Sequence, residues 1–328
     1  MPSDASVVVC AFTLERWDDL VAALSSVRAQ EPPGRELILV IDYNATLLAR
    51  ARADLSGVTI VENSGPRGLS GARNSGVAIA SGSVVAFLDD DAVAQPGWLA
   101  GLCRPFEDPA VLGTGGRADA AWDTARPSWF PAEFDWVVGC SYRGLPQVVA
   151  TVRNPLGCSM AIRRSVFARV GGFRPEVGRL GTRPAGCEET ELCIRAAQAE
   201  PGGRFVYVPT AAVRHRVPAA RARWAYFRSR CLAEGRSKAI VATLAGSRSG
   251  LSSERAYMLR ILPRGVAAGL VGPLRGDRWG PVRAAVIVLG LATTTLGYVM
   301  GWLALRFERT ARLDQGAVAP IPLPDRSA

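Results

Sequence analysis

Three consecutive aspartates, Asp89, Asp90 and Asp91, follow an apolar run in the stretch FLDDDAV, residues 87–93. The run SVVAFL before them is typical of a buried strand. Residues two apart in an extended chain point the same way, so Asp89 and Asp91 share a face and Asp90 points elsewhere. Paired carboxylates at a strand end are the hard oxygen ligands that Mg²⁺ and Mn²⁺ prefer. A solvated acidic turn that caps the next helix is the alternative interpretation.

A second pair of acids, Glu188 and Glu189, opens the stretch GCEETELCIRAAQ, whose later residues have helical apolar spacing. Negative charge is favourable at the amino end of a helix, so a structural role would account for the pair. A carboxylate at this place can also take a proton from a reacting hydroxyl as a general base. Both interpretations stay open at this point.

The elements that must position these acids are strands rich in valine and isoleucine that alternate with helices. We expect strands at 6–12, 36–42, within 54–63 and at 83–91, and helices at 17–30 and after a glycine-rich loop within 65–82. This alternation predicts an α/β fold with a mostly parallel sheet. Ligands of such sheets bind at the carboxyl ends of the strands. Phe12, Asp42 and the three aspartates all end strands and can therefore converge on one crevice.

Composition and charge limit the function classes. The chain has 328 residues, 48% of them hydrophobic, which is enough for a sizeable core. The net charge is +10, and residues 214–283 carry 15 Lys and Arg against 3 Asp and Glu, a local net of +12. The seven cysteines form no C-x-x-C pair, which favours free thiols in a reducing cytosol over disulfides or zinc. The amino-terminal residues do not resemble a secretory signal.

An uncharged run of 22 residues, 284–305, follows the basic block. As a helix it would be about 33 Å long, which matches a hydrocarbon core of roughly 30 Å. Arginines flank it on both sides, with the excess on the amino-terminal side, which places that side in the cytoplasm. We therefore expect a transmembrane helix, with a buried core helix as the alternative. The stretch GYVMG (297–301) offers a small-x-x-x-small face that would allow a homodimer.

The segment before this run mixes arginines with apolar residues and is interrupted by Pro263 and Pro273, as in an interfacial helix. We expect the basic block to face anionic lipid or a lipid phosphate rather than nucleic acid. The expected organisation is a catalytic domain at 1–240, basic juxtamembrane helices at 241–283, a transmembrane helix at 284–307 and a short tail at 308–328.

Taken in order, five motifs resemble family 2 glycosyltransferases over about residues 6–240: SVVVCAF, VIDYN, GLSGARNSGVAIASGSVVAFLDDDAVAQPGWL, NPLGCSMAIRRSVFARVGGF and CEETELCIRA. The resemblance implies a GT-A fold, a nucleotide-sugar donor and inversion at the anomeric carbon. It also implies a hydroxyl of a glycan or a lipid-linked sugar as the acceptor. The aromatic and proline-rich segment 118–144 would lie on the acceptor side, or only pack between subdomains.

The resemblance also assigns roles to single residues. The aspartate triplet matches the D-x-D motif, in which Asp91 would hold Mn²⁺ or Mg²⁺ and Asp89 would lie beside the metal and the donor ribose. His215, the chain's only histidine, would be a third metal ligand, although a lone histidine is often structural. Phe12 and Asp90 belong to the same expected donor crevice.

Asp42 would contact the base and Arg73, in ARN, the diphosphate. Because a carboxylate can accept the N3–H of uracil, a UDP-sugar is favoured. Glu189 stands where the family has an aspartate base, and Glu188 is the second candidate. Two other classes compete. A sugar nucleotidyltransferase would carry a glycine-rich loop after its first strand, where CAFTLERW has no glycine. An inactive membrane-bound binding protein would keep the fold without turnover.

Overall fold

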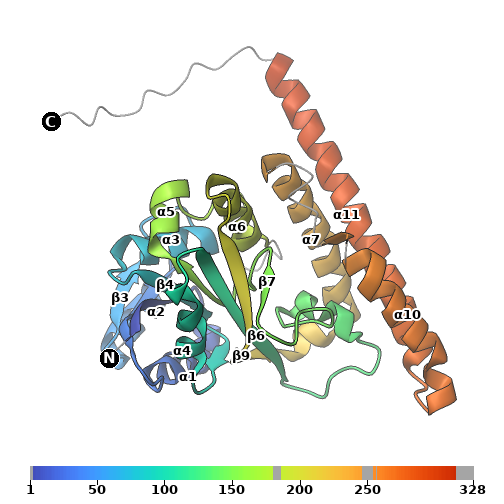
Figure 1. The fold of residues 1–328 in the computed structure, drawn as a ribbon, viewed down its shortest axis with the longest axis horizontal. Coiled ribbons are helices and arrows are strands. Elements are labelled where there is room, and N and C mark those ends of the chain that lie inside the picture. The colour runs from blue at the N-terminus through green and yellow to red at the C-terminus, as the bar shows by residue number, and fades with distance from the viewer. Residues whose placement is uncertain (1–2, 180–185, 246–253, 256, 315–328) are drawn as a thin grey trace.

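The structure is a computed structural model that describes residues 3–179, 186–245, 254–255 and 257–314. Its first half confirms the expected alternation of strands and helices (Figure 1). The elements are β1 (Ser3–Ala11), α1 (Trp17–Arg28), β2 (Gly34–Ile41), α2 (Ala45–Asp54), β3 (Thr59–Glu62), α3 (Leu69–Ile79) and β4 (Val84–Asp89). The four strands are parallel in the order β3-β2-β1-β4, so their carboxyl ends meet at one edge.

The second half of the chain extends the sheet in mixed orientation, in the order β4-β8-β6-β9-β5, while β7 pairs with β9. The pairs of β8 with β4 and β6 are antiparallel, and β6 is parallel to β9. The elements are β5 (Ala92–Ala94), α4 (Trp98–Cys103), β6 (Val111–Trp122), β7 (Ala150–Val152), β8 (Ser159–Arg163), α5 (Arg164–Val170), α6 (Glu188–Ala199) and β9 (Arg204–Val217).

His215 lies within β9, near the end of this long strand. The strand continues because β5 pairs with its far end, and this pairing sets His215 opposite Ala92. A three-residue strand such as β5 has too little pattern to be recognised in the sequence.

Helical elements close one side of the molecule (Figure 1). They are α7 (Trp224–Ala245), η5 (Tyr257–Ile261), α10 (Leu262–Val271), η6 (Gly272–Arg275) and α11 (Gly280–Asp314). Pro263 opens α10 and Pro273 opens η6, so both prolines mark the expected breaks. The boundary expected at residue 240 falls inside α7. Of the expected tail 308–328, residues up to Asp314 continue α11, and the rest lies outside the described residues.

By length and composition, α11 is the one helix in the described chain that could cross a membrane, over Gly280–Phe307. Only 28% of its most apolar window is buried within the protein. A buried core helix would be largely covered by other residues. The exposed surface of α11 therefore favours a membrane helix over a buried core helix. Gly297 and Gly301, the expected pairing face, pack against α7 of the same chain.

The apolar side chains form a core on each face of the sheet and a third cluster beneath the helices. Val7 and Val9 face one core and Val8 the other, as the two-residue period of a strand requires. The third cluster joins the segment 118–144 to α7, α10 and α11, and includes Phe130, Phe134, Phe227, Leu262 and Ile287. The aromatic segment is therefore packed, and it ties the membrane-type helix to the sheet.

We predict that Phe227→Ala lowers the free energy of unfolding by about 3–5 kcal/mol, the usual loss for a buried phenylalanine. Phe227 is 1% exposed and its ring contacts Phe130 and Phe134. Phe307→Ala is the matched control, because Phe307 is 72% exposed on α11. Thermal unfolding in detergent compares the two variants. Equal melting temperatures would mean that the third cluster does not support the fold.

Candidate active site

The carboxyl ends of the strands bring together a group of metal-type ligands. Asp89 ends β4, and Asp91 follows in the turn to β5, which pairs with β9. Ligand atoms of Asp89, Asp91 and His215 all lie within 4.8 Å of one another. His215 Nε2 is 3.1 Å from Asp91 Oδ1. Asp89 and Asp91 therefore share one side, as the two-residue spacing predicted, and β9 adds the imidazole.

Two arginines neutralise this group. Arg16 Nη1 lies 3.1 Å from Asp91 Oδ2, and Arg221 Nη2 lies 3.2 Å from the same oxygen. Burial raises the pKa of Asp91, but His215 and the two arginines outweigh it and hold that pKa well below its usual range. Burial lowers the pKa of His215, but the Asp91 carboxylate outweighs it and raises the pKa to about 10. The paired side chains therefore carry opposite charges at neutral pH.

Asp90 does not belong to the group of close ligand atoms that Asp89, Asp91 and His215 form. Its Oδ1 accepts a hydrogen bond from Arg16 Nη1 at 3.0 Å. Its Oδ2 is buried and has no hydrogen-bond partner among the residues that the structure describes. Burial and the adjacent Asp91 carboxylate raise the pKa of Asp90 to about 7. A buried acceptor without a donor is costly, so this oxygen can take a hydrogen bond from a ligand.

Arg73 links the two groups of acids that the sequence analysis had treated separately. Its Nη1 donates to Glu188 at 2.8 Å, and its Nη2 to Asp89 at 3.2 Å and to the carbonyl oxygen of Gly157 at 2.9 Å. The guanidinium is fully buried. The resemblance assigned Arg73 to the diphosphate, whereas these contacts make it a bridge between carboxylates. The loop before α3 packs closely on the first turn of this helix because Gly71 has no side chain: a Cβ there would lie 1.8 Å from the oxygen of Pro66.

Asp42 holds the loop that precedes α3. Its carboxylate accepts hydrogen bonds from Asn63 Nδ2 at 2.7 Å and from the backbone N–H of Gly68 at 3.0 Å. A small hollow of about 50 Å³ lies beside it, lined by Phe12, Asp42, Asp89, Asp90 and Asp91 among others. The residues expected at the donor crevice, apart from Arg73, are thus brought together in one place.

Glu188 and Glu189 begin α6 and differ in their surroundings. Glu188 is buried and paired with Arg73, while Glu189 is half-buried and accepts a hydrogen bond from the Thr190 hydroxyl at 3.1 Å. Among the described residues, no cation lies within ion-pair distance of Glu189. Burial and the Glu188 carboxylate raise the pKa of Glu189 to about 7. Glu189 can therefore exchange a proton near neutral pH.

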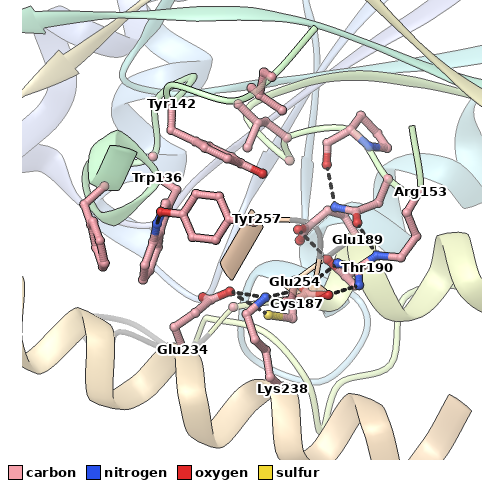
Figure 2. Close-up of a pocket in the computed structure, with 18 of the residues that line it drawn as sticks. Trp136, Tyr142, Arg153, Cys187, Glu189, Thr190, Glu234, Lys238, Glu254 and Tyr257 are labelled. Atoms are coloured by element: carbon pink, nitrogen blue, oxygen red, sulfur yellow. Dashed lines mark hydrogen bonds and ion pairs between the residues drawn. The ribbon is translucent and has the colours of Figure 1, made fainter. Parts of the chain in front are cut away.

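A larger cavity of about 800 Å³ adjoins the small hollow, and Leu69, Asp89 and Arg179 line both. Its residues run from Asp89, Glu189 and His215 to Leu291 and Tyr298 of α11. Figure 2 shows aromatic side chains on one side of this cavity and charged side chains on the other. The rings of Tyr142 and Tyr257 lie 5.4 Å apart. The cavity therefore joins Asp89, Glu189 and His215 to a wall that is largely apolar.

An ion-paired network lines the charged side of this cavity. Glu254 Oε2 is 2.5 Å from Arg153 Nη1, and its Oε1 is 2.6 Å from Lys238 Nζ. Lys238 also pairs with Glu234, which pairs in turn with Arg230. The network was not predicted from the sequence, and neither were the contacts of Arg16 and Arg221. The only local signal was the four-residue spacing of Arg230, Glu234 and Lys238, because the other contacts join distant parts of the chain.

Comparisons with known proteins agree with this arrangement. Residues 6–171 match the family model described as glycosyl transferase family 2. The chain is 31% identical over 303 residues to the glucosyl-dolichyl phosphate glucuronosyltransferase of Haloferax volcanii, covering 91% of this chain and 96% of that protein. It is 26% identical to the succinoglycan biosynthesis protein ExoM of Rhizobium meliloti, covering 85% of this chain and 98% of that protein.

Among solved structures, the mannosyltransferase PcManGT from Pyrobaculum calidifontis, in complex with GDP-Man and Mn²⁺, superposes with a TM-score of 0.55. The likeness covers 93% of this chain and 87% of that chain at 19% identity, and it confirms the expected GT-A fold.

We predict that Arg73→Met lowers the free energy of unfolding by about 3–5 kcal/mol, because it leaves the buried Glu188 carboxylate without its cation. Arg117→Met is the control, since Arg117 forms an exposed ion pair with Asp119, a kind of pair that is worth about 0–1 kcal/mol. Thermal unfolding of both variants measures the difference. If Arg73→Met is as stable as Arg117→Met, the bridge is not what holds Asp89 and Glu188 together.

Proposed function

Because the chain belongs to glycosyl transferase family 2, we propose that this glycosyltransferase moves a sugar from a nucleoside diphosphate to a hydroxyl of a lipid-linked acceptor. One observation carries the proposal: Asp89, His215 and Glu189 line the same cavity, which continues to the apolar helix α11. The candidate metal ligands, the candidate base and an apolar wall that suits a lipid thus line one continuous cavity.

The donor nucleotide would bind against the small hollow at the ends of β1, β2 and β4. The Asp42 carboxylate accepts two hydrogen bonds on Oδ1 and one on Oδ2, which leaves room for a further donor. The N3–H of uracil is such a donor, so UDP is the favoured carrier. The unpartnered Oδ2 of Asp90 would accept a hydrogen bond from a ribose hydroxyl. Phe12 lines the same hollow.

Asp89, Asp91 and His215 would hold a divalent metal. Two carboxylates and an imidazole within 4.8 Å of one another fit Mn²⁺ well and Mg²⁺ through their oxygens. A bound metal would stabilise the negative charge of the departing diphosphate as a Lewis acid. His215 must lose its proton to become a ligand, because only neutral imidazole coordinates. Arg16 and Arg221 would keep Asp91 oriented.

Glu189 would act as the general base. The acceptor oxygen attacks the anomeric carbon as the bond to the diphosphate breaks, and the hydroxyl proton passes to Glu189. A single displacement of this kind inverts the anomeric carbon. Glu188 is the weaker candidate because its carboxylate is engaged by Arg73 at 2.8 Å. Arg73 is a positioning residue in this scheme, since it fixes Asp89 and Glu188 on opposite sides of one guanidinium.

The acceptor would occupy the larger cavity. A sugar can stack on the faces of Tyr142 or Tyr257, while an attached lipid extends toward Leu291 and Tyr298. The Haloferax volcanii relative is named for a glucosyl-dolichyl phosphate, which is a lipid-linked sugar. A soluble glycan acceptor is the alternative outcome. Nucleotide sugars are made in the cytoplasm, so we place the reaction at the cytoplasmic side of the membrane to which α11 attaches the enzyme.

Purified protein incubated with a panel of nucleotide sugars is expected to release nucleoside diphosphate from its donor. Turnover should stop in EDTA and return with Mn²⁺ or Mg²⁺. Asp91→Ala should lose activity while keeping its circular dichroism spectrum, and Asp90→Ala should lose less. Asp119→Ala, at an exposed position of β6, is the control and should match the wild type. Full activity in Asp91→Ala would remove the metal assignment.

Glu189→Gln should lose at least about 10²-fold in rate with unchanged donor affinity, the usual scale of general-base catalysis. The base must be deprotonated, so the wild-type rate should rise with pH up to a pKa of about 7 and level off above it. The residual rate of Glu189→Gln should lack this rise. If Glu188→Gln is inactive and Glu189→Gln is active, the general base is Glu188. Activity in both variants would contradict the mechanism.

A further inference from the structure

One face of α11 is apolar along the whole of the candidate span. Its exposed side chains recur at helical spacing, so they form a stripe along a single side of the helix. The neighbouring α10 and η6 add further exposed apolar residues. We call this surface the outer face, and it includes Leu270, Leu274, Val288, Leu296, Leu303 and Phe307.

The opposite face of α11 packs so closely against α7 of the catalytic domain that the two helix backbones are in contact. A Cβ at Gly297 would lie 2.1 Å from the carbonyl oxygen of Leu232 on α7. A Cβ at Gly235 of α7 would lie 2.0 Å from the carbonyl oxygen of Thr294. Further along, Gly301 approaches Ala239. The two helices touch through glycines on both sides, so this contact is built into the sequence.

Charged side chains lie on α7 along its contact with α11. Arg228 and Arg236 are exposed on α7, and Lys238 and Glu234 line the cavity. Contacts with the domain reach from Ile287 to Gly301, which is about 21 Å of helix at roughly 1.5 Å per residue. A bilayer crossing along this axis would hold much of α7 at the depth of a hydrocarbon core of roughly 30 Å. Charged groups at that depth are costly.

Basic and aromatic residues border the outer face. Arg275 and Arg278 are exposed near one end of α11, and Arg306 near the other. Trp279 and Trp302 are partly exposed at the same two levels, and the Arg306 guanidinium lies 4.3 Å from the Trp302 ring centroid. An apolar stripe bordered by arginine and tryptophan is typical of helices that lie in a membrane interface. The exposed arginines at the two ends of α11, Arg275, Arg278 and Arg306, complement anionic headgroups.

We propose that α10 and α11 lie in the plane of the cytoplasmic leaflet and do not cross the bilayer. The outer face enters the acyl region of an anionic leaflet, and the bordering arginines meet the lipid phosphates. The catalytic domain keeps its contact with α11 and stays at the surface. This inference rests on the membrane attachment proposed above, and it is independent of the donor, the metal and the base.

The same arrangement brings the acceptor to the reaction centre. Met258 and Arg260 of η5 and Thr295 of α11 line the larger cavity and are exposed. The mouth of the cavity therefore opens next to the outer face. A lipid-linked sugar can reach Glu189 while its lipid chain remains in the leaflet, so the acceptor does not have to leave the membrane.

Topology tests the proposal directly. Full-length protein is made in bacteria with one epitope tag before Met1 and another after Ala328, and sealed vesicles of both orientations are treated with protease. We expect both tags to be digested in inverted vesicles and both to be protected in right-side-out vesicles. Tags on opposite sides of the membrane would overturn the proposal. If the protein is recovered in the soluble fraction after lysis, the proposed membrane attachment is wrong. This result would not contradict the proposed glycosyl transfer.

A matched pair of variants tests the contact on which the argument depends. Gly297→Leu adds bulk against α7, whereas Ala292→Leu adds the same kind of bulk at an exposed position of α11. Gly297→Leu should melt at a lower temperature in detergent than the wild type, and Ala292→Leu should melt with the wild type. If Gly297→Leu is as stable as Ala292→Leu, the contact between α11 and α7 does not contribute to stability. The helix α11 could then separate from α7 and cross the membrane, and the proposal would fail.

Discussion

The compensation of buried carboxylates at the strand ends is the interaction on which the site depends. The edge of the sheet collects the buried carboxylates of Asp90, Asp91 and Glu188 together with the partly exposed carboxylate of Asp89. Two unit charges about 4 Å apart interact by roughly 4 kcal/mol at an effective dielectric constant of about 20, so uncompensated acids would repel strongly.

Three arginines relieve this repulsion, and each comes from a different element. Arg16 ends the short helix η1 (Leu14–Arg16), Arg73 lies in α3, and Arg221 lies in η4 (Ala219–Ala222). Each contacts acids that come from other parts of the chain. The charges can balance only when sheet, helices and the end of β9 are in place. Assembly of the fold and assembly of the site are therefore one event.

The sequence predicts well what is encoded locally. The alternation of β1 to β4 with helices, the shared face of Asp89 and Asp91 and the acids that open α6 all follow from short-range patterns. Arg221 could not be assigned in this way, because its partner Asp91 lies 130 residues away. The apolar run 284–305 was recognised as a helix of membrane type, but averaging over a window hides the difference between its two faces. The stretch GYVMG was interpreted as a face for a homodimer, whereas Gly297 and Gly301 pack against α7 of the same chain.

Lys238 is the chain's only lysine, and its place in the cavity has a practical consequence. Burial lowers its pKa, but Glu234 and Glu254 outweigh this and raise it above the usual value. The ammonium group is thus protonated and ion-paired, and an amine-directed reagent finds little nucleophile there while both carboxylates stay in place. Acylation of Lys238 requires those pairs to open. In a mass spectrum of the acylated protein, the amines to assign are the α-amino group and the Lys238 side chain. The extent of acylation at Lys238 then measures how often its ion pairs with Glu234 and Glu254 open.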